Sequence, residues 1–204
     1  NLPKAKTHSL TLVTGAVNLT VIGLIVLGGI GFPVMLDISR SWNGDWRRLW
    51  ERLTLHSKIM VLGTAALLVS GAVAFLLLEW DGVLAGMPLP ERLLAALFHS
   101  TTCRTAGFNT IDVGQLTSAT LFLSILLMLI GTGPCSTGGG FKVSTFCVLL
   151  VRGWRTIAGH RHVMAFRRTI PESAVARAMT ATMVFGVIAI VGVTSLLVCE
   201  QATE

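Results

Sequence analysis

The strongest constraint on this chain is a set of long apolar segments that carry almost no charge. A helix that crosses a lipid bilayer needs about 20 mostly apolar residues, and three segments meet this requirement: Leu10–Leu36, Met60–Leu78 and Ala178–Val198. Of all 204 residues, 52% are hydrophobic and only 13% are charged, whereas soluble domains carry about 25% charged residues. We therefore expect an all-α integral membrane protein.

A fourth apolar segment, Leu116–Val151, is too long to be a single span. At about 1.5 Å per residue, a straight helix of this length would measure about 54 Å, against a hydrocarbon core of about 30 Å. Its centre reads GTGPCSTGGG, and a helix interior tolerates proline and repeated glycine poorly. We expect one broken helix, with halves at Leu116–Ile130 and Phe141–Val151 joined by an irregular loop.

The loops between the spans differ in charge, and this difference predicts their orientation. Cytoplasmic loops of membrane proteins carry an excess of lysine and arginine. The loop Glu79–Pro90 has acidic residues and no basic residue, whereas the loops on either side are rich in arginine: Arg40, Arg47, Arg48 and Arg52, then Arg152, Arg155, Arg161, Arg167 and Arg168. These loops are expected in the cytoplasm. They also hold most of the net charge of +6, so nucleic acid is not an expected partner.

A short helix is expected at Leu89–Ser100. Pro90 at its start sacrifices no hydrogen-bonded N–H, and Glu91 suits the positive end of a helix. About three turns cannot cross a bilayer, and the polar segment FHSTTCRTAGFNTIDVG overlaps the end of this helix and follows it. Non-helical backbone at membrane depth must be buried in protein or line a water-filled path. The pattern therefore predicts a re-entrant unit.

The polar segment has the composition of an ion-selectivity filter. Small side chains leave the backbone carbonyls of Thr105–Phe108 open to a pathway, and rings of such carbonyls can replace the water shell of a potassium ion. Gly107 can adopt a conformation closed to other residues, and the short helix directs its negative end toward a cation. An ordinary extracellular loop with a turn at Ala106–Gly107 is the alternative interpretation.

Several motifs, in order along the chain, resemble the Trk/Ktr/HKT superfamily of potassium transporters. TTCRTAGFNTID resembles the pore loop of that superfamily, and GTGPCSTGGGFKVSTF resembles its intramembrane gating loop. Further matches are GGIGFP at Gly28–Pro33, LHSK at Leu55–Lys58 and RRTIPE at Arg167–Glu172. The resemblance covers essentially the whole chain.

The resemblance implies helix–pore loop–helix repeats of a potassium-channel-like pore, four of them in one polypeptide. Residues 1–57 would hold the last helix of the second repeat and a cytoplasmic loop. Residues 58–152 would form the complete third repeat, with its helix, pore helix, filter loop and broken helix with the gating loop. Residues 153–204 would hold a cytoplasmic loop and the first helix of the fourth repeat. The chain would supply one filter loop of four.

The resemblance also assigns roles to individual residues. The ion-binding filter would be the backbone carbonyls of Thr105, Ala106, Gly107 and Phe108, and its support would come from Cys103, Arg104 and Asn109. The gating loop would comprise Gly131, Gly133, Pro134, Cys135, Ser136, Thr137, Gly138, Gly139, Gly140 and Lys142; a passive kink packed between helices is the alternative.

Two basic residues beside these loops need a reason for their position. Arg104 is expected to point away from the pore axis and to brace the filter loop through several hydrogen bonds. Lys142 is an ionisable residue near membrane depth and so a functional candidate by default, either to hold the gating loop to a carbonyl or to repel cations. The alternative is a lysine that reaches a polar cavity or the cytoplasmic interface.

Two cysteines depart from the pattern of the superfamily. Cys135 stands where members often have glycine, so its Cβ and thiol are expected to restrict the gating loop. Cys103 stands where a small polar residue is expected. The glycine-rich loop is not a phosphate loop, because Phe141 separates Gly140 from Lys142 and so breaks the required spacing.

Together these features predict potassium uptake through a carbonyl-lined filter gated by an intramembrane loop, without enzymatic chemistry. Potassium would be the substrate, and no cofactor is expected in this chain. A sodium or mixed potassium/sodium transporter and a short tetrameric cation channel are the alternatives. An intramembrane hydrolase that uses Cys135 or Ser136 would need a base from another element, and a purely structural membrane protein would leave the filter-like loop unexplained.

The resemblance also implies partners and a location. The protein would be a multi-pass protein of the bacterial inner (plasma) membrane, a homodimer in the lipid bilayer, and the docking site of a cytosolic nucleotide-binding regulatory subunit. The basic segment His160, Arg161, His162, Arg167 and Arg168 lies on the expected cytoplasmic face. Its simplest interpretation is positive-inside charge; contact with the regulatory subunit is the second.

Overall fold

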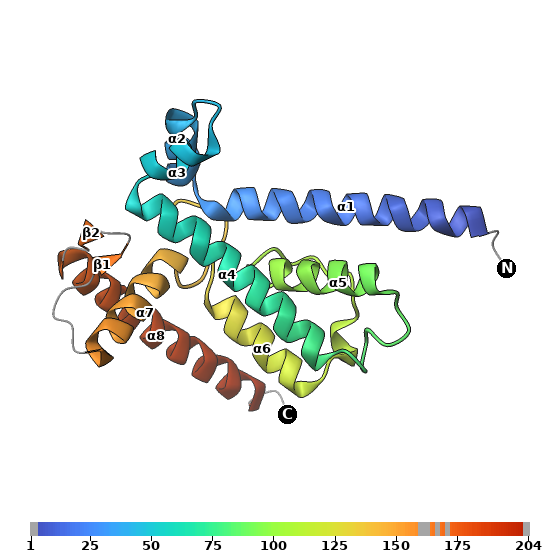
Figure 1. The fold of residues 1–204 in the computed structure, drawn as a ribbon. Coiled ribbons are helices and arrows are strands. Elements are labelled where there is room, and N and C mark those ends of the chain that lie inside the picture. Colours follow the sequence, from blue (N-terminus) through green and yellow to red (C-terminus); the bar gives the residue numbers. More distant parts are fainter. Residues whose placement is uncertain (1–3, 159–163, 166–167, 170–171, 202–204) are drawn as a thin grey trace. The chain divides into compact units, whose positions relative to one another are not determined.

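The computed structural model describes residues 4–158, 164–165, 168–169 and 172–201 (Figure 1). In chain order its elements are α1 (Lys4–Ile30), α2 (Phe32–Ser41), α3 (Trp46–Arg52), α4 (Leu55–Leu78), α5 (Leu89–Thr102), the 3-10 turn η1 (Val113–Gln115), α6 (Ser118–Leu129), α7 (Val143–Ile157), β1 (Met164–Ala165), β2 (Arg168–Thr169) and α8 (Glu172–Gln201). Apart from the two-residue strands, which pair antiparallel, the described elements are helical. The expected all-helical class is confirmed.

The chain divides into two compact units, residues 1–143 and 144–204. Helix α4 in the first unit and the segment Val175–Ser195 of α8 in the second are long and apolar enough to cross a membrane. They coincide with two of the predicted spans. The predicted break is also present, since α6 ends at Leu129 and α7 begins at Val143, and α5 occupies the position of the predicted short helix.

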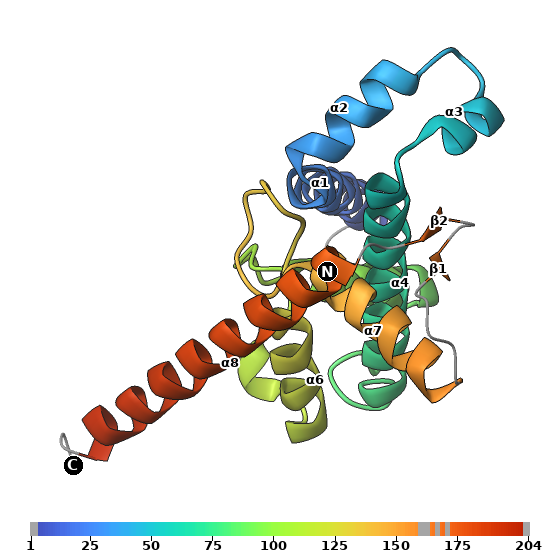
Figure 2. The same ribbon diagram turned by 90° about the vertical axis from the view of Figure 1, so that its left-hand side faces the viewer.

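The first predicted span, Leu10–Leu36, is wrong as a single helix. The chain bends by 94° between Gly15–Ile30 and Phe32–Ser41, which Figure 2 shows with α1 seen end-on. Gly31 at the bend has a φ of 96°, a left-handed value that favours glycine. Pro33 has no N–H to continue the helical ladder. Because the residues on both sides of the bend are apolar, the hydrophobic pattern of the sequence does not indicate it.

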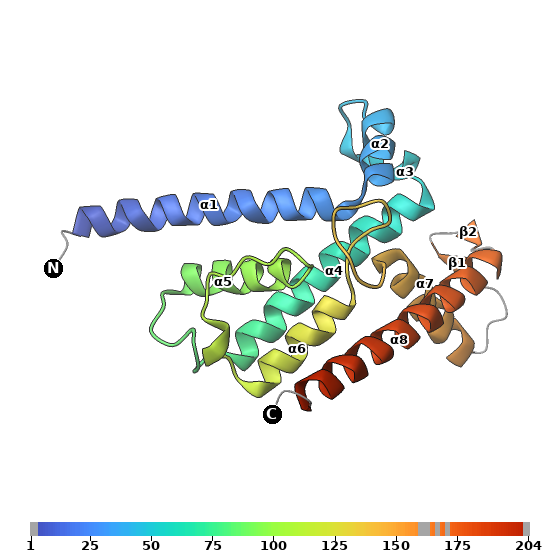
Figure 3. The ribbon, with the colours of Figure 1, turned by 180° about the vertical axis from the view of Figure 1, so that it is seen from behind.

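Helices α4, α5 and α6 pack together at the position of the predicted re-entrant unit. Both α5 and α6 lie beside α4, and α1 runs along α5 (Figure 3). The core joins all three: Ala72 and Phe75 from α4, Leu84 from the following turn, Ala96 from α5, and Leu116 just ahead of α6. This packing fixes α5 so that its C-terminal end leads into the predicted filter loop.

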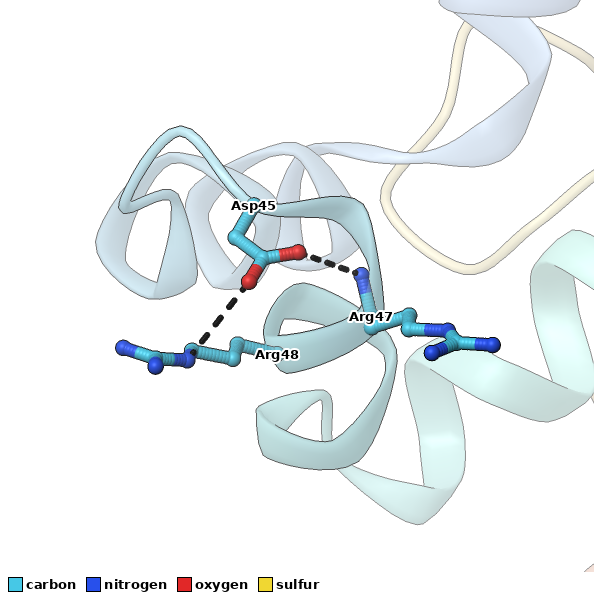
Figure 4. A network of polar contacts seen from close by, with 3 residues as sticks. All are labelled: Asp45, Arg47 and Arg48. Carbon is cyan, nitrogen blue, oxygen red and sulfur yellow. Dashed lines mark hydrogen bonds and ion pairs between the residues drawn. The ribbon is translucent and has the colours of Figure 1, made fainter.

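The arginine-rich loop after α2 contains a short helix, α3, with a capping aspartate. The Asp45 carboxylate accepts a hydrogen bond from Arg47 N at 3.2 Å and forms an ion pair with Arg48 at 3.5 Å (Figure 4). An aspartate in this position satisfies an N–H that a helix start leaves without a partner. The exposed ion pair contributes little, so the cap is the main local reason for a seven-residue helix here.

A carboxylate joins α2 to the start of α4. Asp37 Oδ2 accepts hydrogen bonds from Thr54 N at 2.9 Å, Thr54 Oγ1 at 2.8 Å and Ser57 Oγ at 2.5 Å. Thr54 is itself the N-cap of α4. Three hydrogen bonds to one oxygen therefore hold α2 against the start of α4.

The same arrangement recurs between α4 and α6. Glu79 Oε1 accepts from Thr117 N and Oγ1, both at 2.9 Å, and from Thr120 Oγ1 at 2.7 Å, and Thr117 is the N-cap of α6. Val83 N donates to Oε2 at 3.3 Å. Glu79 is fully buried, and burial alone would raise the pKa of its carboxyl, but these four hydrogen bonds outweigh burial and leave that pKa lowered.

We predict that Glu79→Gln lowers the free energy of unfolding of the full-length protein by about 2 kcal/mol, because an amide N–H₂ would face the Val83 donor and the charge would be lost. The folded-state pKa lies below the ordinary value of 4.5, so this stability is present above pH 4.5 and lost as pH falls through the lowered pKa. Thermal unfolding at several pH values measures both effects.

The neighbouring exposed Asp81 supplies the control, since Asp81→Asn removes the same charge without a buried network. Equal melting temperatures for Glu79→Gln and Asp81→Asn at neutral pH would contradict the stabilising role of Glu79.

Candidate functional site

The predicted filter loop begins in the last turn of α5. Cys103 N bonds to His99 O and Ala106 N bonds to Thr102 O, both at 3.1 Å, so helical bonding continues to Ala106. The regular helix ends at Thr102, and in the residues that follow it Thr105 and Gly107 have φ values of 63° and 75°. Glycine adopts this region without strain, whereas a β-branched threonine there is an outlier. The handedness of the backbone thus inverts twice within three residues.

A single buried hydroxyl holds the two ends of this loop together. Thr102 Oγ1 donates to Phe108 O at 2.5 Å and accepts from Phe108 N at 3.1 Å. The later part of this loop is accessible: Thr105, Gly107 and Phe108 are exposed, as is Asn109 just beyond. Sequence reasoning missed Thr102, although the run of hydroxyl residues Ser100–Thr102 ahead of the loop is a visible signal.

Cys103 and Arg104 lie behind the loop and are buried. Arg104 Nη2 donates to Thr64 O in α4 at 2.9 Å. We expected several hydrogen bonds from the Arg104 guanidinium, and the one observed among the described residues is this bond to Thr64 O. The guanidinium therefore connects the loop to α4.

A further polar contact missed by sequence reasoning lies behind the loop. His99 Nε2 is 2.9 Å from Ser124 Oγ in α6, and the His99 ring stacks on Phe75 of α4 with centroids 4.3 Å apart. Cys103 Sγ is 3.7 Å from the same His99 nitrogen. One histidine of α5 thus contacts both flanking helices.

The predicted gating loop connects α6 to α7, and its two ends lie side by side. Its neck is held by hydrogen bonds from Gly131 N to Phe141 O at 2.9 Å and from Thr132 N to Gly139 O at 3.3 Å. Lys142 Nζ donates to Gly138 O at 3.0 Å, one of the two roles considered for this lysine. The loop is therefore held by its own backbone and by one ammonium group.

The two loops touch each other. Gly139 N donates to Thr105 Oγ1 at 3.2 Å. Beside this contact is a cavity of about 350 Å³, lined by the three segments that meet there: Leu24 and Ile25 of α1, Thr105 and Phe108 of the filter loop, and Thr137 and Gly138 of the gating loop.

Cys135 in the gating loop has a φ of 54°. Its neighbour Ser136 donates to Gly133 O at 2.6 Å and lies 2.7 Å from Thr132 Oγ1, so the hydroxyl bonds within the loop. Cys135, which stands where the superfamily often has glycine, therefore adopts a backbone conformation that costs a non-glycine residue about 1 to 2 kcal/mol.

The basic segment considered for a regulatory subunit lies mostly outside the described residues. His160, Arg161, His162 and Arg167 are outside them, and Arg168 is described only as part of β2.

Comparison with known proteins identifies relatives over nearly the whole chain. A family model described as TrkH, a cation transport protein, matches residues 12–203. The Ktr system potassium uptake protein B of Vibrio alginolyticus is 39% identical over 189 residues, and the potassium/sodium uptake protein NtpJ of Enterococcus hirae is 38% identical over 183 residues. These alignments cover 92% and 89% of this chain, but 41% and 39% of the relatives.

Among solved structures, the potassium transporter TrkH from Vibrio parahaemolyticus matches with a TM-score of 0.67 at 20% identity, over 90% of this chain and 38% of that one. At this identity the likeness shows the fold alone. The chain thus spans about two fifths of the length of the relatives it matches.

We predict that Cys135→Gly raises the free energy of unfolding by about 1 kcal/mol. Glycine removes the left-handed strain of the folded state, but it also increases the conformational entropy of the unfolded chain, which offsets part of that stabilisation. Chemical or thermal unfolding of the full-length protein measures the change. Cys135→Ala is the matched control, since it removes the thiol but keeps Cβ, and it should leave stability near that of the unsubstituted protein. An equal gain in both variants would assign the effect to the thiol.

Proposed function

Since the chain belongs to the TrkH family of cation transport proteins, we propose that the complete protein takes up potassium ions through a carbonyl-lined filter gated by an intramembrane loop. The chain contributes one filter loop and one gate. Residues 1–57 end the second repeat, residues 58–152 are the third repeat, and residues 153–204 begin the fourth. The name of the Vibrio alginolyticus relative, a potassium uptake protein, supports potassium as substrate.

The observation that carries this proposal is the inverted backbone of the filter loop. When the sign of φ alternates from one residue to the next, successive carbonyls turn toward the same side of the chain. Thr105 and Gly107 have such positive φ values. The loop also continues the C-terminal end of α5, which carries partial negative charge. Carbonyls of Thr105–Phe108 on one side would then replace the water around a potassium ion.

The contact between the two loops supports the gate. Gly139 lies 3.2 Å from Thr105 Oγ1, so the 131–142 loop occupies the space next to the filter. Small residues let such a loop move aside. The hydrogen bond from Lys142 to Gly138 supports a role of this lysine in holding the loop in its present position.

Partners and location follow from the same family membership. We propose a multi-pass protein of the inner membrane, built as a homodimer and regulated by a cytosolic nucleotide-binding subunit on its arginine-rich face. The relatives are more than twice as long as this chain, which supports four repeats in one polypeptide over four copies of a short channel.

One observation favours a second substrate. NtpJ of Enterococcus hirae, at 38% identity, is named a potassium/sodium uptake protein. Mixed potassium and sodium transport through the same filter is therefore the second candidate function.

The test is ion uptake by the full-length protein in cells that lack their own potassium uptake, with Gly107→Ser beside the unsubstituted form. The variant should lose at least tenfold of its preference for potassium over sodium, because a side chain and a strained φ would disturb one of four filter loops. A Cβ at Gly107 meets no atom within 4 Å, so the fold should tolerate it. Gly44→Ser, at another open glycine with positive φ, is the matched control.

Potassium-dependent rescue with unchanged selectivity in Gly107→Ser would keep the transporter and remove Gly107 from the filter. A lack of uptake of either ion by the unsubstituted protein, shown to be in the membrane, would overturn the proposed function.

Arg104→Lys tests the support of the filter. Lysine keeps the charge but loses the planar guanidinium that reaches Thr64 O, so potassium uptake should fall about tenfold with the protein still present in the membrane. The exposed Arg47, replaced by lysine, is the control. Uptake and ion preference unaltered by Arg104→Lys would contradict the bracing role.

A further inference from the structure

The bend between α1 and α2 leaves backbone groups without helical partners. In a continuous helix, Phe32 N would donate to Gly28 O, and residue 33 would donate to Gly29 O. Residue 33 is proline and has no N–H, and the chain turns away at Gly31. Buried polar groups of this kind need partners elsewhere in the protein, above all in a bilayer.

The 131–140 loop supplies those partners. Gly133 N donates to Gly29 O at 2.8 Å, and Thr137 N donates to Gly28 O at 3.4 Å. In return, Phe32 N donates to Cys135 O at 3.2 Å. Figure 3 shows the loop, in gold, beside the junction of α1 and α2. Each of the two broken helical bonds is thus replaced by bonding to this loop.

At two positions the fit between the bend and the loop leaves no room for a side chain. A Cβ on Gly31 would lie 2.5 Å from Pro134 O, and a Cβ on Gly133 would lie 2.4 Å from Ile30 O. Real Cβ atoms do not approach backbone this closely. The contact is therefore backbone against backbone and specific to these positions.

Helix α2, which follows the bend, is held independently of the loop. Its Asp37 accepts three hydrogen bonds from the start of α4. The loop, by contrast, is attached to its own helices through the narrow neck at Gly131 and Phe141. Of the two segments in this contact, we therefore expect the loop to be the one that moves.

We propose that the bend Gly28–Phe32 is the seat of the gate: it holds the 131–140 loop against the filter, and the gate opens when the loop leaves this seat. The proposal rests on the proposed function of the loop as a gate. It adds positioning residues from the preceding repeat, which lie about 100 residues earlier in the chain than the loop they hold.

A reversible cross-link tests the seat. A Cβ on Gly28 would lie 3.1 Å from Thr137 Oγ1, which is the position that the sulfur of a cysteine at 137 would take, so the two cysteine sulfurs can approach to the S–S bond length of about 2 Å. We would introduce Gly28→Cys and Thr137→Cys together into the full-length protein, with its native cysteines replaced by alanine, and measure potassium flux into vesicles. Oxidation should reduce flux at least tenfold, and a reductant should restore it.

The two single variants, Gly28→Cys and Thr137→Cys, are the controls, and oxidation should leave their flux unchanged. Verified cross-linking of the double variant with undiminished flux would overturn the seat.

The docking itself has a readout that does not depend on transport. Adding Gly31→Val to the double variant should place a side chain against Pro134 O and lower the yield of the cross-link at least fivefold. An unchanged yield would contradict the seat. Because this yield is measured without any ion, it still decides the docking if the unsubstituted protein carries no potassium, an outcome that would count against the proposed function.

Discussion

The structure depends on one constraint: in a bilayer, every backbone N–H and C=O that leaves a helix must find a partner within the protein. The interruptions of helical structure meet it in three ways. The bend at Gly31 and the 131–140 loop satisfy each other through Gly29 O and Phe32 N. The filter loop is held at both ends by Thr102 Oγ1. The starts of α4 and α6 are completed by the carboxylates of Asp37 and Glu79. Each irregular segment is thus bonded to a second element, and the proposed filter loop, the proposed gating loop and the bend form one connected assembly within residues 1–143.

The sequence predicted those interruptions that are marked by strong local signals. GTGPCSTGGG breaks a helix under any arrangement of its neighbours, and Pro90 with Glu91 marks the start of α5. The bend at Gly31 was missed because one glycine and one proline in an apolar run are equally compatible with a kinked span. The two carboxylate contacts were also missed, since Glu79 meets Thr117 across 38 positions and nothing in the local pattern around either residue indicates the other. Local chemistry predicted the elements, and long-range hydrogen bonds decided how they are joined.

The proposed filter loop shows the same division between local and long-range effects. Gly107 was predicted from its freedom of φ, and its φ of 75° fits that reasoning. The positive φ of Thr105 was not predictable, because β-branched residues seldom adopt it. Its hydroxyl offers a physical reason: Oγ1 donates to Arg104 O at 2.7 Å and accepts from Gly139 N at 3.2 Å. A strained residue that persists only because its surroundings determine it is typical of functional sites, and here the surroundings include the gating loop.

The strength of the contact between bend and loop suits a gate. Three backbone hydrogen bonds contribute about 1 kcal/mol each when water can replace them, so the seat favours the docked loop by about 3 kcal/mol. That corresponds to a population ratio of about 100 to 1, enough to keep the loop in place and small enough for a partner or an ion to reverse. Cys135, which accepts from Phe32 N, has a φ of 54°, so left-handed strain lies in the contact itself. A glycine at this position would carry the same hydrogen bond without that strain.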